Sequence, residues 1–223
     1  TDALAELHAL PHSSCDYGAL YEPFWKVLKI AHTNFIASGA DSVADYGSFQ
    51  TFVNDASGWL DDYTSFMGLK AHFGGCSWQD WDAEYRSHTA FKDKELPEAA
   101  QSASELHKFA QYLFFKQYEK FHNYASLQGI EILGDLPIFV ALDSTDVWAN
   151  PELFQLDANG KPVQVAGVPP DYFAADGQLW GNPLYDWNAH AADGFKWWLS
   201  RIKSNLELYD SIRLDHFRGF ESY

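Results

Sequence analysis

The stretch from Gly129 to Val140, GIEILGDLPIFV, decides the fold class. It is apolar and rich in residues that favour β-strands, and it follows a long segment whose apolar residues have helical spacing. A helix that leads into a buried strand is half of an α/β unit. Pro137 has no backbone N–H to give to a neighbouring strand, so we expect the regular strand to end near Leu136 or to bulge there.

The rest of the chain extends this prediction in both directions. Upstream, apolar periodicity with glycine stops predicts three helices, near residues 20–38, 57–73 and 97–128. We expect Pro23 to lie in the first turn of the first helix or to mark an irregular start. Downstream, residues 211–214 form a second short apolar stretch that also follows a helical pattern. Two strands that each follow a helix indicate a parallel sheet or a barrel. We therefore expect a mainly helical subdomain over residues 1–128 and a strand-bearing segment over residues 129–223.

The least helical region lies between the two strands. Residues 154–156 and 163–165 predict a β-hairpin that turns at Asn159–Gly160. Residues 166–185 are rich in proline, glycine and polar residues, which predicts a long loop, and long ordered loops are usually functional.

Composition excludes several classes of function. Fifteen lysines and arginines face 31 acidic residues, a net charge of −16, which disfavours nucleic acid and anionic membranes as partners. We find no apolar run of about 20 residues and no signal peptide, so we expect no membrane span. Cys15 and Cys76 stand far apart without a metal-binding motif, which favours a reducing cytoplasm.

Arg213 and Asp215 are the strongest candidates for chemistry. Residues two apart on a strand share one face, and a guanidinium favours the ionised form of a nearby carboxyl. An ionised carboxylate at the C-terminal end of a barrel strand suits a nucleophile, although Arg-x-Asp also occurs as a structural ion pair. Asp135 and Asp143 could face the same strand end or cap loops. The histidines show no metal-ligand spacing, and we expect neither metal nor cofactor.

The number and placement of aromatic residues in the sequence favour a sugar ligand. The chain has 17 Phe, 12 Tyr and 9 Trp, and several of them sit beside Asn, Gly, Pro and Asp. Core packing accounts for many such rings, but flat rings in polar loops suit the apolar faces of sugars.

Several loop motifs together closely resemble the 4-α-glucanotransferases, also called amylomaltases or disproportionating enzymes. They are GDLPIFV at 134–140, DS at 143–144, DVWANPE at 146–152, AGVPPDYF at 166–173, Gln178 with WGNPLY at 180–185, and RLDHFRG at 213–219. Upstream, Trp59-Leu60, Tyr63, Leu69-Lys70, HFGG at 72–75 and Trp78 fit the family's helical insertion more loosely. Order and spacing agree throughout.

The resemblance implies part of a (β/α)8 TIM barrel with a large helical insertion in its N-terminal half. It implies transfer of α-1,4-glucan segments between maltooligosaccharides or starch-like glucans, with retention. By position in the motifs, Asp215 corresponds to the nucleophile and Arg213 to its ionic partner. The expected sugar contacts are Asp143 and His216 in the donor site, and Tyr172, Phe173, Trp180, Asn182 and Pro183 on a mobile loop over the glucan.

Length is the main departure from the family. A barrel takes about 250 residues, and the family's general acid and transition-state-stabilising aspartate come from later strands. Neither Glu207 nor Glu221 matches the acid motif. We therefore expect an internal fragment that is inactive alone.

Two alternatives to the transferase function remain: an α-glucan hydrolase of the α-amylase clan, where Arg-x-Asp recurs, and a non-catalytic carbohydrate-binding module. The WGNP loop favours the transferase.

Overall fold

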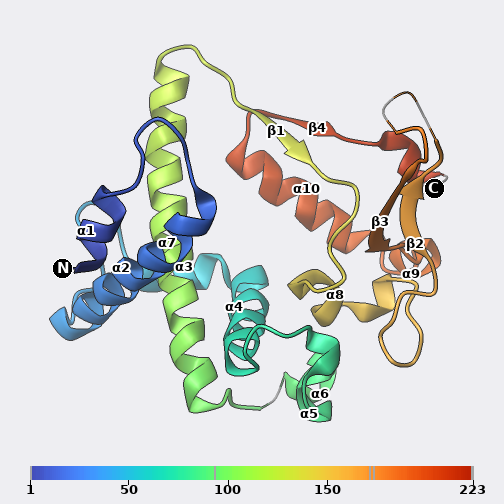
Figure 1. The fold of residues 1–223 in the computed structure, drawn as a ribbon, viewed down its shortest axis with the longest axis horizontal. Coiled ribbons are helices and arrows are strands. Elements are labelled where there is room, and N and C mark those ends of the chain that lie inside the picture. The colour runs from blue at the N-terminus through green and yellow to red at the C-terminus, as the bar shows by residue number, and fades with distance from the viewer. Residues whose placement is uncertain (1, 93, 171, 173, 222–223) are drawn as a thin grey trace. The chain divides into compact units, whose positions relative to one another are not determined.

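The computed structural model describes residues 2–92, 94–170, 172 and 174–221, and in it the chain divides into two compact units. The first unit comprises Thr1–Gly68 and Glu98–Lys116, and the second comprises Leu69–Pro97 and Gln117–Tyr223. Two helices, α4 (Ser57–His72) and α7 (Glu98–Leu127), each contribute to both units (Figure 1).

The first unit is helical and has an aromatic core. Besides parts of α4 and α7 it contains α1 (Asp2–His8), α2 (Tyr17–Ser38) and α3 (Phe49–Asp55). One core cluster of this unit is made up of the buried residues Leu28, Phe35, Phe109 and Tyr112. The Tyr112 hydroxyl donates to the Gly47 carbonyl at 2.7 Å and accepts the Val43 N–H at 3.1 Å, so a buried polar group is satisfied while it fixes the loop between α2 and α3.

The three predicted helices are confirmed, with one difference at the start of α2. The Asp16 carboxylate accepts the Ala19 N–H at 3.0 Å and caps the helix there, so α2 begins at Tyr17. Pro23 therefore lies inside the helix rather than in its first turn. Gly39 ends α2 with a positive φ of 65°, the left-handed cap that glycine adopts without steric cost.

A parallel strand pair organises the second unit. Strands β1 (Leu133–Leu136) and β4 (Ser211–Leu214) pair in parallel, with Asp135 opposite Arg213. They lie side by side with α10 (Lys196–Leu208) along them (Figure 1). The pairing confirms the predicted α/β character, and β1 ends at Leu136 as expected. A Cβ at Gly134 would lie 2.1 Å from the Tyr209 ring, so this strand position must be glycine.

The predicted hairpin is present in short form, because Leu156 bridges to Pro162 in antiparallel pairing and the Val163 N–H donates to the Gln155 carbonyl at 2.9 Å. The region predicted as a long loop is instead built around an antiparallel ribbon. Strand β2 (Val165–Val168) pairs with β3 (Gln178–Pro183), and Phe154 bridges to Tyr185. The loop prediction is therefore wrong for the strand residues. Gly167 allows the close approach, because a Cβ there would lie 2.6 Å from the Gln178 carbonyl oxygen. The predicted turn at Asn159–Gly160 is present, and the Asp157 carboxylate accepts the Asn159 N–H at 2.8 Å.

Residues 69–97, from the predicted helical half, pack in the second unit. Here Trp81 contacts Trp148 with ring centroids 6.1 Å apart, and the Trp148 indole donates to the Tyr85 carbonyl at 2.8 Å. The short elements of this unit are η1 (Trp78–Asp80), α5 (Ala83–Arg86), α6 (His88–Phe91), α8 (Thr145–Ala149), η2 (Pro151–Leu153), α9 (Trp187–Ala192) and η3 (Phe217–Phe220). The contacts thus divide the chain differently from a boundary at residue 128, and an inserted subdomain over 1–128 stays a prediction.

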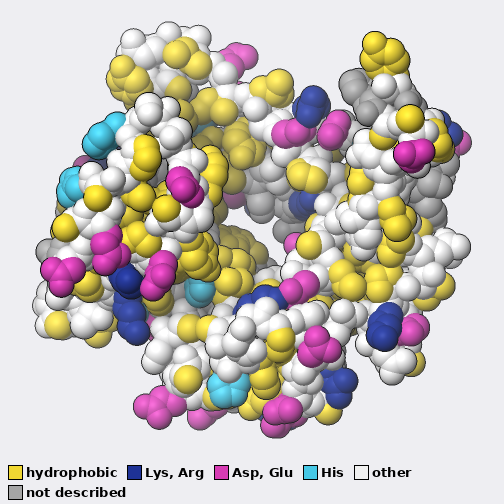
Figure 2. All heavy atoms as spheres, viewed as in Figure 1, with side chains coloured by type: hydrophobic (Ala, Val, Ile, Leu, Met, Phe, Trp, Pro, Cys, Tyr) yellow, Lys and Arg dark blue, Asp and Glu magenta, His cyan; other side chains and the backbone are white. Residues whose placement is uncertain are grey.

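Acidic side chains are spread over the visible face in Figure 2, with lysine and arginine between them, in keeping with the net charge of −16. Within the described ranges, no helix has both the length and the apolar character needed to cross a membrane.

Candidate active site

The ends of the two parallel strands bring three charged side chains together. Arg213 on β4 donates from Nε to Asp135 Oδ1 at 2.9 Å and from Nη2 to Asp135 Oδ2 at 2.7 Å. The same Nη2 lies 3.9 Å from Asp215 Oδ1. This two-point contact with Asp135 fixes the plane of the guanidinium, which leaves one edge toward Asp215.

The main partner of Arg213 is therefore Asp135, whereas the sequence indicated Asp215. The hydrogen bond from Arg213 is the largest cause that lowers the pKa of Asp135, and the pKa of Arg213 is raised by Asp135 and, more weakly, by Asp215. Both groups of the pair stay charged at neutral pH. All three side chains are more than half exposed, so the arrangement is open to a ligand.

His216 follows Asp215 in a left-handed backbone conformation with φ 50°, which is uncommon for a residue other than glycine. Its ring meets Trp180 edge to face at 5.0 Å. His216 Nε2 is buried and has no hydrogen-bond partner among the described residues. Gly219 makes room for this ring, because a Cβ there would lie 2.8 Å from both His216 Cδ2 and Ile138 Cδ1.

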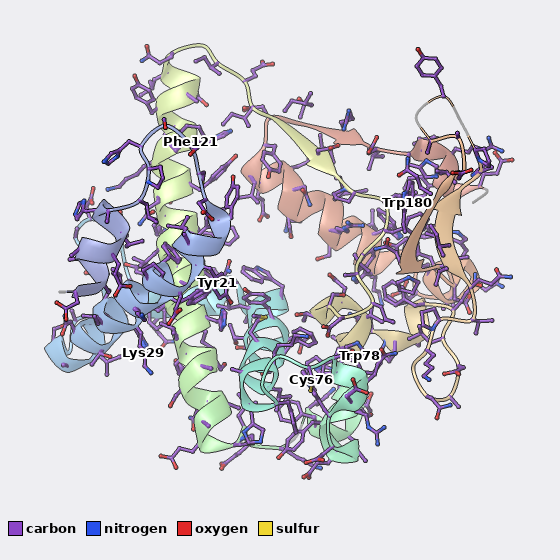
Figure 3. All side chains as sticks on the ribbon, viewed as in Figure 1. Tyr21, Lys29, Cys76, Trp78, Phe121 and Trp180 are labelled. Carbon is purple, nitrogen blue, oxygen red and sulfur yellow. The ribbon has the colours of Figure 1, made fainter. Side chains whose placement is uncertain are left out.

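Strand β3 carries the other predicted sugar contacts to the same place. Trp180, labelled in Figure 3, lies on this strand. Its side chain is 38% exposed, and its indole donates to the Gln178 side chain at 3.0 Å. Asn182 donates from Nδ2 to the Val140 carbonyl at 2.8 Å, which ties β3 to the segment after β1. Pro183 is buried and pairs with Val165, so it supports the ribbon rather than offering a surface.

The loop between β2 and β3 carries the last two predicted contacts. Tyr172 is 98% exposed. Phe173 lies outside the described residues.

Asp143 is held in a different set of contacts. Its carboxylate forms an ion pair with Lys70 and accepts the Trp78 backbone N–H at 3.4 Å. The Trp78 indole donates to the neighbouring Leu142 carbonyl at 2.8 Å. The structure thus groups the predicted residues into an Asp215–His216–Trp180 set and an Asp143 set. Asp215 and His216 follow β4 and Asp143 follows β1, whereas Trp180 lies on β3.

An aromatic cluster supports the segment after β1. The Tyr185 hydroxyl donates to the Ile138 carbonyl at 2.6 Å, and Arg201 donates to the Pro137 carbonyl at 2.6 Å. Burial is the largest cause that raises the pKa of Asp146, which accepts the Trp197 indole N–H at 3.2 Å. Sequence reasoning missed Arg201, because nothing in its neighbourhood distinguishes it from a surface residue of a helix.

The arrangement suits chemistry at a carboxylate. Asp215 can attack an electrophilic carbon, and the fixed guanidinium beside it stabilises its charge. His216 follows Asp215 and contacts Trp180, and its Nε2 has no hydrogen-bond partner in the described part of the chain. These two rings can contact a polyhydroxylated ligand. Over the described ranges of the chain, no group of three or more His, Cys, Asp or Glu side chains could hold a metal ion.

Known proteins with similar sequence are glucan-transferring enzymes. The 4-alpha-glucanotransferase of Streptococcus pneumoniae serotype 4 is 42% identical over 212 residues, 95% of this chain and 41% of that protein. The 4-alpha-glucanotransferase of Thermus thermophilus is 44% identical over 216 residues, 96% of this chain and 42% of that protein. The chain thus spans about two fifths of the length of these curated relatives.

A solved structure agrees with this comparison. The amylomaltase from Streptococcus agalactiae in complex with acarbose matches with a TM-score of 0.77 at 38% identity, over 92% of this chain and 41% of that one. The family described as 4-alpha-glucanotransferase matches residues 1–223. The chain therefore belongs to the 4-alpha-glucanotransferase family.

Proposed function

We propose that this chain is the nucleophile-bearing part of an enzyme that transfers α-1,4-glucan segments from one maltooligosaccharide to another with retention. The observation that carries the proposal is the placement of Asp215 at the C-terminal end of a parallel strand, beside an arginine that Asp135 holds in place. Family membership supplies the substrate class. The complex of a relative with acarbose supports a carbohydrate ligand.

The proposed reaction has two steps at one carbon. The Asp215 carboxylate attacks the anomeric carbon of the donor, and the bond to the leaving sugar oxygen breaks as that oxygen takes a proton from a general acid. A hydroxyl of the acceptor then displaces the aspartyl ester, and its proton passes to the conjugate base of the same general acid, which restores the acid and frees the Asp215 carboxylate. Retention requires the acid roughly 5–5.5 Å from the nucleophile. We assign no acid within residues 1–223, since by resemblance it lies on a later barrel strand.

The aromatic side chains have a separate role in the proposal. A transferase must favour a sugar hydroxyl over water as the attacking group. Trp180 and the exposed Tyr172 offer flat apolar faces for glucose rings, and an acceptor packed there displaces water from the ester. His216 Nε2, buried and unpaired among the described residues, is suited to a hydroxyl of the donor sugar.

The proposed fold is part of a (β/α)8 barrel with a helical insertion. The parallel β1–β4 pair and α10 provide adjacent barrel strands and an outer helix, and the site lies at the C-terminal ends of the strands, as in barrel enzymes generally.

The chain covers 41–42% of its relatives, so we ascribe the activity to a protein of the relatives' length. Two exposed cysteines without a disulfide fit a cytoplasmic enzyme.

The test is a product analysis of the full-length protein that contains this sequence. Incubated with maltotriose, it should release glucose together with longer oligosaccharides, whereas a hydrolase would give only shorter sugars. Asp215→Asn should abolish transfer and leave maltoheptaose binding within a few-fold of the parent. Near-normal turnover by that variant would remove Asp215 from its role. Residues 1–223 alone should release no glucose.

A further inference from the structure

The end of α4 contributes a charged side chain that the proposed chemistry does not use. Lys70 lies in the last turn of α4, and its ammonium contacts the Asp143 carboxylate and donates to the Cys76 carbonyl at 3.1 Å. Lys70 and Asp143 are 73 positions apart in the sequence. The Lys70 side chain is only 20% exposed, in contrast to surface ion pairs of this chain such as Lys94–Glu84, with exposures of 42% and 54%.

The turn after α4 is shaped to hold this lysine. Gly74 and Gly75 both have positive φ, 66° and 84°, and the Gly75 N–H donates to the Lys70 carbonyl at 2.7 Å. This reversal brings the Cys76 carbonyl back beside the Lys70 ammonium. The same carbonyl accepts the indole N–H of the buried Trp81 at 3.3 Å, which fixes the turn to the core. The lysine is therefore held at its head group, and its position is defined by the fold.

The Asp143 carboxylate is held from a second side by Trp78. This residue is 5% exposed, and Figure 3 shows it next to Cys76. Its backbone N–H donates to Asp143 Oδ1, and its indole donates to the Leu142 carbonyl. One carboxylate oxygen thus faces Lys70 and the other faces Trp78. A carboxylate offers about four lone-pair sites, so each oxygen can accept one further hydrogen bond.

We propose that Lys70 is a positioning residue for the donor glucan: it fixes the Asp143 carboxylate so that this group accepts a hydrogen bond from a sugar hydroxyl. The inference rests on the proposed function. Asp143 is 38% exposed and lies on the segment that leaves the C-terminal end of β1, the end at which ligands of parallel α/β sheets bind. Without Lys70, the exposed Asp143 carboxylate would sample several rotamers. Ligand binding would then have to order this side chain, and the entropy lost in doing so would weaken the affinity.

The test measures binding and turnover separately in the full-length protein. Maltoheptaose binding is followed by tryptophan fluorescence in the Asp215→Asn background, where turnover is absent, and KM and kcat for maltotriose are measured with Asp215 intact. Lys70→Met keeps the length of the side chain and removes its charge. It should weaken binding and raise KM about tenfold, with little change in kcat, because the hydrogen bond is made equally in the ground state and the transition state. Lys70→Arg should restore binding to within about threefold.

A double-substitution cycle separates positioning from general stability. If Lys70 acts through Asp143, then Lys70→Met should have no further effect on binding in a protein that already carries Asp143→Asn. Lys94→Met, which removes a matched ion pair in the same unit, should change neither binding nor KM. An unchanged affinity in Lys70→Met, or a loss that persists undiminished with Asp143→Asn, would overturn the inference. If Lys70→Met does not fold, the test passes to Asp143→Asn, and an unchanged affinity for maltoheptaose in that variant would overturn the inference. A parent protein that binds maltoheptaose but transfers nothing would contradict the proposed function instead.

Discussion

Replacing Arg201 should destabilise the segment that leaves β1. Arg201 reaches from α10 and donates to the Pro137 carbonyl at 2.6 Å, to the Ile138 carbonyl at 3.3 Å and to the Tyr185 hydroxyl at 3.4 Å. We expect Arg201→Met, which keeps most of the aliphatic stem, to lower the free energy of unfolding by about 2–3 kcal/mol.

The magnitude follows from the individual contacts. The short bond to the proline carbonyl involves a charged donor and is worth about 1.5–3 kcal/mol, while the two longer bonds add less. The guanidinium also lies 5.2 Å from the Trp197 ring centre and 5.1 Å from that of Trp198, at about 0.5–1 kcal/mol each. The net loss of unfolding free energy is smaller than the sum of these contacts, because the Ile138 carbonyl keeps its hydrogen bond from Tyr185 and the Pro137 carbonyl can bind water.

The assay is a urea titration followed by tryptophan fluorescence, since the two neighbouring indoles report directly on this region. Lys203→Met is the matched control on the same helix. Lys203 is 79% exposed and lies 3.9 Å from Glu207, so its loss should cost less than about 0.5 kcal/mol. Equal effects of the two substitutions would refute the reasoning, because they would mean that the Arg201 contacts add nothing to an ordinary helical cation.

Two further predictions concern the charged pair and the first unit. Asp135→Asn should lower kcat for glucan transfer by about 100-fold and change maltoheptaose binding less than threefold. The reason is that Arg213 loses the partner that fixes the plane of its guanidinium beside Asp215. An unchanged kcat would contradict this. Burial lowers the pKa of His107 from its usual 6.5. Below about pH 6.5 the unfolded chain therefore binds more protons than the folded one, so the free energy of unfolding should fall as the pH falls. His107→Phe should flatten that slope between pH 7.5 and 5.5 in urea titrations, and an equally steep slope would show that other groups cause it.

The elements that the sequence predicts well are those with one dominant local cause. Strand β1 lies in an apolar run, and its regular pairing stops before Pro137, which has no N–H to donate. Gly39 ends α2 because glycine adopts the left-handed cap. The β2–β3 ribbon escaped prediction because Gln178–Gly181 is exposed on both faces and shows no alternation of apolar and polar residues. Its pairing rests on backbone hydrogen bonds that leave no hydrophobic pattern.

The candidate site divides in the same way. The relation of Arg213 to Asp215 is local and visible in the sequence, since Asp215 follows Arg213 by two residues, directly after the end of β4. The pairing of Arg213 with Asp135 depends on the register of two parallel strands 78 residues apart. A slip of one residue would send these side chains to opposite faces, and no pattern in either strand specifies that register alone.

One segment connects the fold to the candidate site. Because β1 ends at Leu136, the carbonyls of the segment that begins at Pro137 lie outside the strand pairing and accept hydrogen bonds from side chains instead. The donors come from separate parts of the second unit. Arg201 on α10 donates to the carbonyls of Pro137 and Ile138, and Asn182 on β3 donates to that of Val140. Trp78 in η1 donates to the Leu142 carbonyl, and Lys70 on α4 forms an ion pair with the Asp143 side chain. A run of seven residues is thus fixed from four elements without forming regular structure. An irregular backbone with this many anchors can present a carboxylate at a set angle to a ligand, which a strand with alternating faces could not do at the same place. The proline that limits the sheet therefore also creates the acceptors by which distant helices shape the site.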